Sequence, residues 1–351
     1  MNRLFVAAYS ACLLLGPLGL FPLAAFDAGE VEDAINDEQY EMFVPPGYGN
    51  TAVLFIKGRM YTISKGYKEF MKDAPLPAIK RPISSLVGFF HHGAPQDPVT
   101  IRAGGAGLEV RTDGGGYFSV SLPAPPGAGW KGSTGVELIA KDGSLFRGTV
   151  YVPNPDAKLG VISDIDDTVK MTGVHDKGRV AEEMLFGDAE TDKPVPGMAV
   201  LYADIARSGR EGRRPFHYVS ASPYALSDRL VKFFSINRFP SGSLDLMGLD
   251  LSKDIMSGIA GRIIRYKKSA IENIFSAFPN RRFLLFADNG QEDPKIYSRL
   301  LSSHPDRIEA IYIREVEKGK ARQTEYPSFL FFTSPDEVRA DLVRRGIIRR
   351  D

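Results

Sequence analysis

Cysteine is almost absent from this sequence of 351 residues, and Cys12 is the only one. A chain with a single thiol forms no internal disulfide and offers no cysteine cluster to a zinc ion. The five histidines show no metal-ligand spacing, which also argues against zinc. The net charge is only +1, so the overall charge points to neither a nucleic acid nor an acidic partner. The chemistry of this chain must therefore be sought in other residues.

The N-terminus has the pattern of a secretory signal peptide over residues 1–26. Arg3 is the only early charged side chain, and the chain from Leu4 to Phe26 is apolar or small. An uncleaved anchor helix is the alternative, because the run is long enough to span a bilayer. Either interpretation predicts an exported protein of the periplasm or cell envelope. Cleavage would also remove Cys12.

A length of 351 residues suggests two folded domains. Residues 27–153 are predicted to form a small β-sandwich, because short apolar runs alternate with glycine and proline. Asp113-Gly114-Gly115-Gly116 and Asp142-Gly143 are turn signals between these runs. The expected strands are Thr51–Ile56, Pro98–Arg102, Gly107–Arg111, Tyr117–Leu122, Val136–Ala140 and Phe146–Val152.

Residues 154–351 show the alternation of strands and helices that is typical of a parallel sheet covered by helices. The segment Ser334-Pro335-Asp336-Glu337 predicts a capping box at the start of the last helix. The expected strands are Leu159–Ser163, Pro215–Val219, Phe283–Ala287, Ile308–Ile313 and Phe329–Phe332. The stretch Ser235–Ile259 is a candidate for part of a substrate lid, although the same residues could equally be ordinary core.

Acidic residues follow two of these strands. Asp164 and Asp166 come after the first strand and, two residues apart in an extended chain, should project to the same side. Asp288 ends a later strand and is followed by Asp293. Ligand sites in parallel sheets form at the carboxyl ends of the strands, so we expect these acids to converge there. Crowded carboxylates repel one another, and Mg²⁺ held by oxygen ligands would relieve that repulsion.

Two further places supply donors for a phosphate. Ser220 follows the strand that ends at Val219, where a hydroxyl and backbone amides at a helix entrance can bind phosphate oxygens, although a plain helix cap gives the same pattern. Lys267 and Lys268 precede the apolar run Ile271–Phe278 and are expected near a helix start. A helix start disfavours cations, so a lysine there points to a ligand anion, with the choice between the two lysines open.

These motifs, in this order, resemble those of the haloacid dehalogenase superfamily: DxDxT after a strand, a serine after a second strand, a lysine at a helix start and a late pair of acids after a strand. More narrowly, GVISDIDDTVKMT at 160–172, SASP at 220–223 and ADNGQEDPKIY at 287–297 resemble the phosphatidate phosphatase family founded on a yeast actin-patch protein. The resemblance covers most of residues 146–350, and is weaker at 112–118. It implies a Rossmann-like α/β domain, with helices on both faces of a parallel sheet, after the β-sandwich.

The resemblance also assigns roles. Asp164 would be the nucleophile that forms an aspartyl-phosphate, and Asp166 would be the general acid and base. Thr168, Ser220 and Lys267 would form the phosphate site, in which Thr168 orients the loop and the other two hold the phosphoryl oxygens. The family spacing to the following apolar run favours Lys267 over Lys268.

For the metal, the resemblance implies a Mg²⁺ site made of Asp164, the carbonyl of Asp166 and Asp288, with Asp293 supporting that shell. Two positions depart from the family pattern. The late motif has Ala287-Asp288-Asn289 where the family has Gly-Asp-Ser, and Tyr266 stands where the family has a histidine.

The resulting hypothesis is a Mg²⁺-dependent hydrolase of phosphatidate, which would bring the protein into contact with a membrane surface. Hydrolysis of a soluble phosphomonoester is the first alternative, because inserted segments choose the substrate on a shared core. A non-catalytic binding protein of the cell envelope is the alternative from another class. Nothing in the sequence suggests a nucleic-acid partner, and the oligomeric state is left open.

Overall fold

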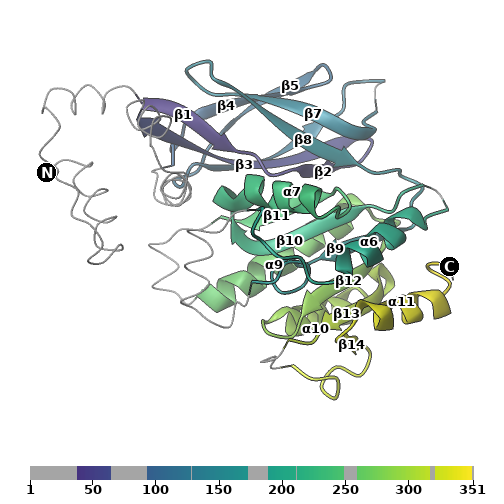
Figure 1. Cartoon of the computed structure of the whole chain (residues 1–351). Coiled ribbons are helices and arrows are strands. Elements are labelled where there is room, and N and C mark those ends of the chain that lie inside the picture. The colour runs from purple at the N-terminus through teal and green to yellow at the C-terminus, as the bar shows by residue number, and fades with distance from the viewer. Residues whose placement is uncertain are drawn as a thin grey trace, which may run out of the picture.

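The computed structural model describes residues 38–64, 93–127, 129–172, 189–210, 212–248, 259–316 and 321–349, and it shows two sheets, one above the other in Figure 1. The predicted signal peptide lies outside these residues. Within the described ranges, no helix is both long enough and apolar enough to cross a membrane.

The N-terminal half is a curled sheet of eight hydrogen-bonded strands. The central strand β3 pairs with β6 along one side and with β1 and β2 along the other. The order then continues through β8, β7, β4 and β5, and β5 comes back to lie beside β6. Pairing is antiparallel except between β2 and β8. The strands are β1 (Glu38–Phe43), β2 (Gly47–Gly49), β3 (Val53–Ser64), β4 (Pro98–Ala103), β5 (Ala106–Arg111), β6 (Tyr117–Pro123), β7 (Gly132–Ile139) and β8 (Leu145–Val152).

Alternation of apolar and polar residues explains this sheet, because every second side chain points to the same face. In β4, Val99 and Ile101 are fully buried. The inward side chains form one apolar core, which also contains Trp130 beside the Gly104 turn. The expected two-sheet sandwich stays a prediction, since the hydrogen bonds join all eight strands in a single sheet.

The C-terminal half is a six-stranded parallel sheet in the order β11-β10-β9-β12-β13-β14. Numbered within this half, the order is 3-2-1-4-5-6, which is found in doubly wound α/β sheets. The strands are β9 (Leu159–Ser163), β10 (Phe216–Pro223), β11 (Ser243–Met247), β12 (Arg282–Asp288), β13 (Ile308–Arg314) and β14 (Leu330–Phe332). The change from one sheet to the other therefore falls between Val152 and Leu159, close to the boundary predicted at residue 153.

Helices cover both faces of the parallel sheet (Figure 1). One face packs against α6, α7 and α11, and the opposite face packs against α9 and α10. The strands between them are almost entirely buried, as expected when both faces are covered. The helices are α6 (Met198–Arg207), α7 (Ser227–Ile236), α9 (Ile259–Ala277), α10 (Asp293–Ser303) and α11 (Pro335–Arg344), with short 3-10 turns η2 (Tyr224–Leu226) and η3 (Pro305–Arg307). The capping box predicted at Ser334 and Glu337 is confirmed.

Two expectations about local structure are wrong, and one open choice is decided. The strand predicted to end at Val219 continues to Pro223, because β10 bulges after Ser220 instead of ending. Helix α9 begins at Ile259, so Lys267 lies well inside it and not near its start. For the stretch Ser235–Ile259, the core alternative holds at residues 243–247, which form the buried edge strand β11, while residues 249–258 lie outside the described residues.

The curled sheet packs against the β11 edge of the parallel sheet. Leu244 donates its backbone N–H to the carbonyl of Pro46 at 2.8 Å, and β2 lies beside β11. Tyr48 packs edge-on against His217 of β10, with ring centroids 5.6 Å apart. A strand edge that would otherwise present unpaired backbone groups is thereby covered.

Candidate active site

The predicted acids gather at the carboxyl ends of β9 and β12. These two strands are neighbours, and they flank the point at which the strand order of the sheet reverses. Ligands of doubly wound sheets bind at this switch point. Asp164, which follows β9, donates its backbone N–H to Phe286 of β12 at 2.9 Å. Asp288, the last residue of β12, is therefore close beside it.

Lys267 lies at the centre of the acidic cluster. Its Nζ is 2.6 Å from Oδ1 of Asp164, and 2.9 and 2.8 Å from the two carboxylate oxygens of Asp293. All three side chains are about 2% exposed or less. Burial alone would lower the pKa of Lys267, but the carboxylates of Asp164 and Asp293 raise it further than burial lowers it. The ammonium group thus remains charged and holds two carboxylates together.

Asp164, Asp288 and Asp293 form a candidate cation site, since one oxygen from each lies within 4.8 Å of the others. The Oδ1 atom of Asp288 accepts from the backbone N–H of Gly290 at 2.6 Å, but its buried Oδ2 has no hydrogen-bond partner in the described part of the chain. A buried carboxylate oxygen without a partner is costly. Three oxygen donors around such an atom fit a hard divalent cation.

The acidic cluster contains three buried carboxylates but only one ammonium group, that of Lys267. Burial raises the pKa of Asp164 to about 7; the Lys267 ammonium opposes this shift, and Asp293 and Asp166 add to it. Burial, followed by repulsion from Asp164 and Asp293, raises the pKa of Asp288 well above its ordinary value. A bound cation would favour the ionised form of these groups.

The Asp166 carboxylate faces a different set of groups. Its Oδ2 accepts hydrogen bonds from Ser220 Oγ and Ser222 Oγ, each at 3.0 Å. The Oγ of Ser220 in turn accepts from the backbone N–H of Ser222 at 2.9 Å. The Asp166 side chain is outside the trio of cation-binding carboxylates, because the chain turns after Asp164 instead of remaining extended. The role expected of the Asp166 carbonyl stays a prediction.

The loop from Asp164 to Thr168 is held by a network of hydrogen bonds. Thr168 donates its hydroxyl to Oδ2 of Asp164 at 3.0 Å, which agrees with the orienting role expected of it. Asp167 has a φ of 55°, which a side chain seldom adopts, and its Oδ1 accepts from the backbone of Thr172 at 2.9 Å. Arg314 of β13 donates to the carbonyl of Asp167 at 2.6 Å. Support of this kind from Asp167 and Arg314 had no separate signal in the sequence.

The two adjacent lysines have different surroundings. Lys267 is in the acidic cluster, whereas Lys268 is partly exposed and pairs with Glu272 one helical turn later, at 2.6 Å. Lys267 belongs to the apolar face of α9, four residues before Ile271, and this face packs on the sheet. The geometry therefore places Lys267 and not Lys268 beside the acids.

The departures from the family pattern have structural explanations. Ala287 is fully buried in β12. Asn289 accepts from the backbone of Val316 at 2.8 Å and donates to the carbonyl of Ala321 at 3.0 Å, so it fixes the chain after β13. Tyr266 donates to Oδ1 of Asp245 at 2.6 Å, away from the acidic cluster.

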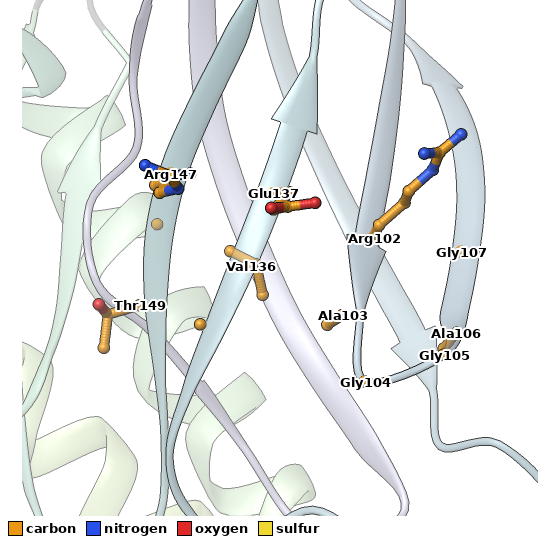
Figure 2. Close-up of a pocket in the computed structure, with 12 residues that line it drawn as sticks. Arg102, Ala103, Gly104, Gly105, Ala106, Gly107, Val136, Glu137, Arg147 and Thr149 are labelled. Carbon is orange, nitrogen blue, oxygen red and sulfur yellow. The ribbon is translucent and has the colours of Figure 1, made fainter.

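A separate open cavity of about 790 Å³ lies on the curled sheet and not at the acids. Figure 2 shows Glu137 of β7 between Arg147 of β8 and Arg102 of β4. All three are exposed, and the rest of the lining consists mostly of small residues such as Gly104 and Gly105. An exposed row of cross-strand charges explains these residues without a ligand.

Comparison with known proteins shows which proteins this chain resembles. Residues 159–315 match the family model described as "Phosphatidate phosphatase APP1, catalytic domain". The chain is 33% identical over 159 residues to Phosphatidate phosphatase APP1 of Saccharomyces cerevisiae, covering 44% of this chain and 26% of that protein. It is 31% identical over 218 residues to an uncharacterised protein of Schizosaccharomyces pombe, covering 60% of this chain and 35% of that protein. The chain thus spans only about a quarter to a third of the length of these relatives.

Solved structures are less informative. A carbohydrate acetylesterase from Xanthomonas citri has a TM-score of 0.30 and 10% identity, with 86% of this chain and 72% of that chain covered. A TM-score this low does not indicate a shared fold.

Proposed function

We propose that this protein, whose residues 159–315 match the family model of the phosphatidate phosphatase APP1 catalytic domain, is a Mg²⁺-dependent phosphatase that hydrolyses phosphatidate to diacylglycerol and inorganic phosphate. The observation that carries the proposal is the buried cluster of Asp164, Asp288, Asp293 and Lys267 at the switch point of the sheet. We extend the proposal to a haloacid-dehalogenase-like fold for this domain and to export through residues 1–26, as expected from the sequence.

The reaction would proceed in two displacements. An Asp164 oxygen attacks phosphorus and forms an aspartyl-phosphate, while the bond to the glycerol oxygen breaks and Asp166 gives that oxygen a proton. Asp166 then takes a proton from water, whose oxygen attacks phosphorus and releases phosphate and the Asp164 carboxylate. Ser220 and Ser222 hold Oδ2 of Asp166, which leaves Oδ1 for the proton.

The remaining groups would position and neutralise charge. Lys267 contacts Oδ1 of Asp164, and its ammonium group would neutralise the negative charge that develops on the phosphoryl oxygens during the reaction. Asp164 and Asp288, with Asp293 supporting them, would hold Mg²⁺, which supplies electrostatic stabilisation of those oxygens when bound. A bound Mg²⁺ would give the buried Oδ2 of Asp288 the partner that it lacks among the described residues.

The test is Mg²⁺-dependent phosphate release from short-chain phosphatidate in mixed micelles, beside a soluble aryl phosphate and an Asp164→Asn control. We expect preference for phosphatidate, and loss of activity in Asp164→Asn. Activity on the soluble ester alone would assign the site to a soluble phosphomonoester. Absence of metal-dependent activity on a broad panel of phosphate esters would overturn the enzyme proposal.

A further inference from the structure

A second buried polar cluster joins the curled sheet to the catalytic half. Lys57 of β3 contacts both carboxylate oxygens of Asp245 in β11, each at 2.9 Å. Tyr266 of α9 donates to Oδ1 of the same carboxylate at 2.6 Å. The Asp245 side chain is only 3% exposed, whereas the Lys57 side chain is 26% exposed, so the carboxylate is buried and its lysine partner is half-buried. Three elements from the two halves of the protein thus meet at one buried carboxylate.

This cluster is adjacent to the proposed active site through helix α9. Tyr266 precedes Lys267, whose Nζ binds Asp164 and Asp293. Successive residues of a helix point in directions about 100° apart, so α9 is fastened at this point in two directions. A helix moves as a unit, and a shift that lengthens the Tyr266 contact also displaces the Lys267 ammonium. Displacements of about 1 Å at a catalytic group can cost about a hundredfold in rate.

We propose that Lys57 and Tyr266 act through Asp245 as positioning residues for Lys267. The curled sheet, which carries Lys57, would then help to fix the geometry of the active site. The proposal rests on the phosphatase function proposed above. It gives a role to Tyr266, which donates to Asp245 and stands next to the lysine at the centre of the acidic cluster.

A second contact between the two halves supports this view. Tyr117, at the start of β6, packs edge-on against Tyr224, with ring centroids 5.4 Å apart. Tyr224 directly follows the segment that carries Ser220 and Ser222. The turn before Tyr117 is fixed by Asp113, whose Oδ1 accepts from the backbone of Tyr117 at 2.9 Å. The curled sheet therefore touches both the lysine helix and the serine segment.

The chain offers a matched control. Within the curled sheet, Tyr40 donates to Oδ2 of Asp97 at 2.7 Å, and Lys141 lies 3.6 Å from Oδ1 of the same carboxylate. This trio has the same three residue types as the Lys57, Asp245 and Tyr266 trio, but its members all belong to the curled sheet or its turns. Substitutions in it remove the same types of group from a more exposed site, with side chains of Lys141 and Asp97 that are 64% and 23% exposed, without reaching α9.

The experiment compares Tyr266→Phe, Lys57→Met and their double variant with Tyr40→Phe and Lys141→Met in the full chain. We expect Tyr266→Phe and Lys57→Met each to lower kcat by about 5- to 20-fold, with KM changed by less than about twofold. The kcat of the double variant should be no more than about twofold lower than that of the less active single variant, because both side chains act through Asp245. The two control variants should keep kcat within about twofold of the parent. Unchanged kcat in Tyr266→Phe, or losses that multiply in the double variant, would overturn the proposal.

A second readout does not depend on turnover. Amide hydrogen exchange over residues 262–270 should be faster in Tyr266→Phe and Lys57→Met than in the parent, and unchanged in the control variants. Faster exchange in a protein without phosphatase activity would refute the proposed function while supporting the positioning of α9. Exchange that is unchanged, or equally fast in the control variants, would overturn the positioning role even in an active enzyme.

Discussion

Replacing Lys267 with methionine tests the electrostatic argument most directly. The variant keeps a side chain of similar length but removes the charge that holds two buried carboxylates, at 2.6 Å from Asp164 and 2.8 Å from Asp293. Leaving a buried charge without its partner typically costs about 3–5 kcal/mol. We expect a loss of unfolding free energy near the upper end of this range, because one ammonium serves two buried carboxylates.

The matched variant is Lys268→Met, which removes an identical group from the next position. Lys268 is partly exposed and loses only a pair with Glu272 one turn later, which is worth about 0.3–0.5 kcal/mol. Urea denaturation of both variants, with and without Mg²⁺, measures the difference. Mg²⁺ should recover part of the loss in Lys267→Met, because it stabilises the folded state by replacing the missing positive charge. Equal losses in the two variants, or no effect of Mg²⁺, would refute this account of the cluster.

Three further predictions concern single side chains. Asp288→Asn removes the charge of the unpartnered carboxylate and should raise the Mg²⁺ concentration needed for half-maximal phosphate release by about tenfold or more, whereas an unchanged requirement would mean that Asp288 is not a ligand. Ser222→Ala removes one of two donors to Asp166 and should lower kcat about fivefold, as expected for about 1 kcal/mol, with full activity arguing against a role in holding that carboxylate. His217 is buried, which lowers its pKa from 6.5 to about 3, with Arg281 adding to the shift. The folded state therefore binds fewer protons than the unfolded state, and stability should fall by up to about 1.4 kcal/mol per unit as pH drops below 6.5. His217→Gln should show a shallower fall between pH 6.5 and 4 in urea denaturation, and parallel curves would contradict the assignment.

The position of the acids could be predicted from the sequence because it depends on a general property of parallel sheets. Asp164 and Asp288 each follow an apolar strand, and strands of this kind deliver their last residues to one edge. The residues alone leave the choice between Lys267 and Lys268 open, and only the family spacing to Ile271 favours Lys267, which lies one turn before Ile271 on the buried face of α9.

Other features depend on contacts between distant residues and could not be predicted in the same way. Strand β11 is short, and its buried position depends on β10 on one side and the curled sheet on the other. The side chain of Asp166 was expected to join Asp164, but the chain turns at residues 165–169 and directs it to Ser220 and Ser222. Residues two apart project to the same side only while the chain stays extended, and here the chain turns directly after Asp164.

The covered edge of β11 has a consequence for how the protein can be divided. The backbone of Leu244 bonds to Pro46, and β2 lies beside β11, so a fragment that starts at Leu159 would be made with one side of its sheet bare. Bare strand edges recruit strands from other molecules. Such a fragment should associate with itself during expression, even though every acid of the site is encoded within it. The N-terminal half, synthesised first, would then serve the later half as a template that is already in place when the edge strand emerges.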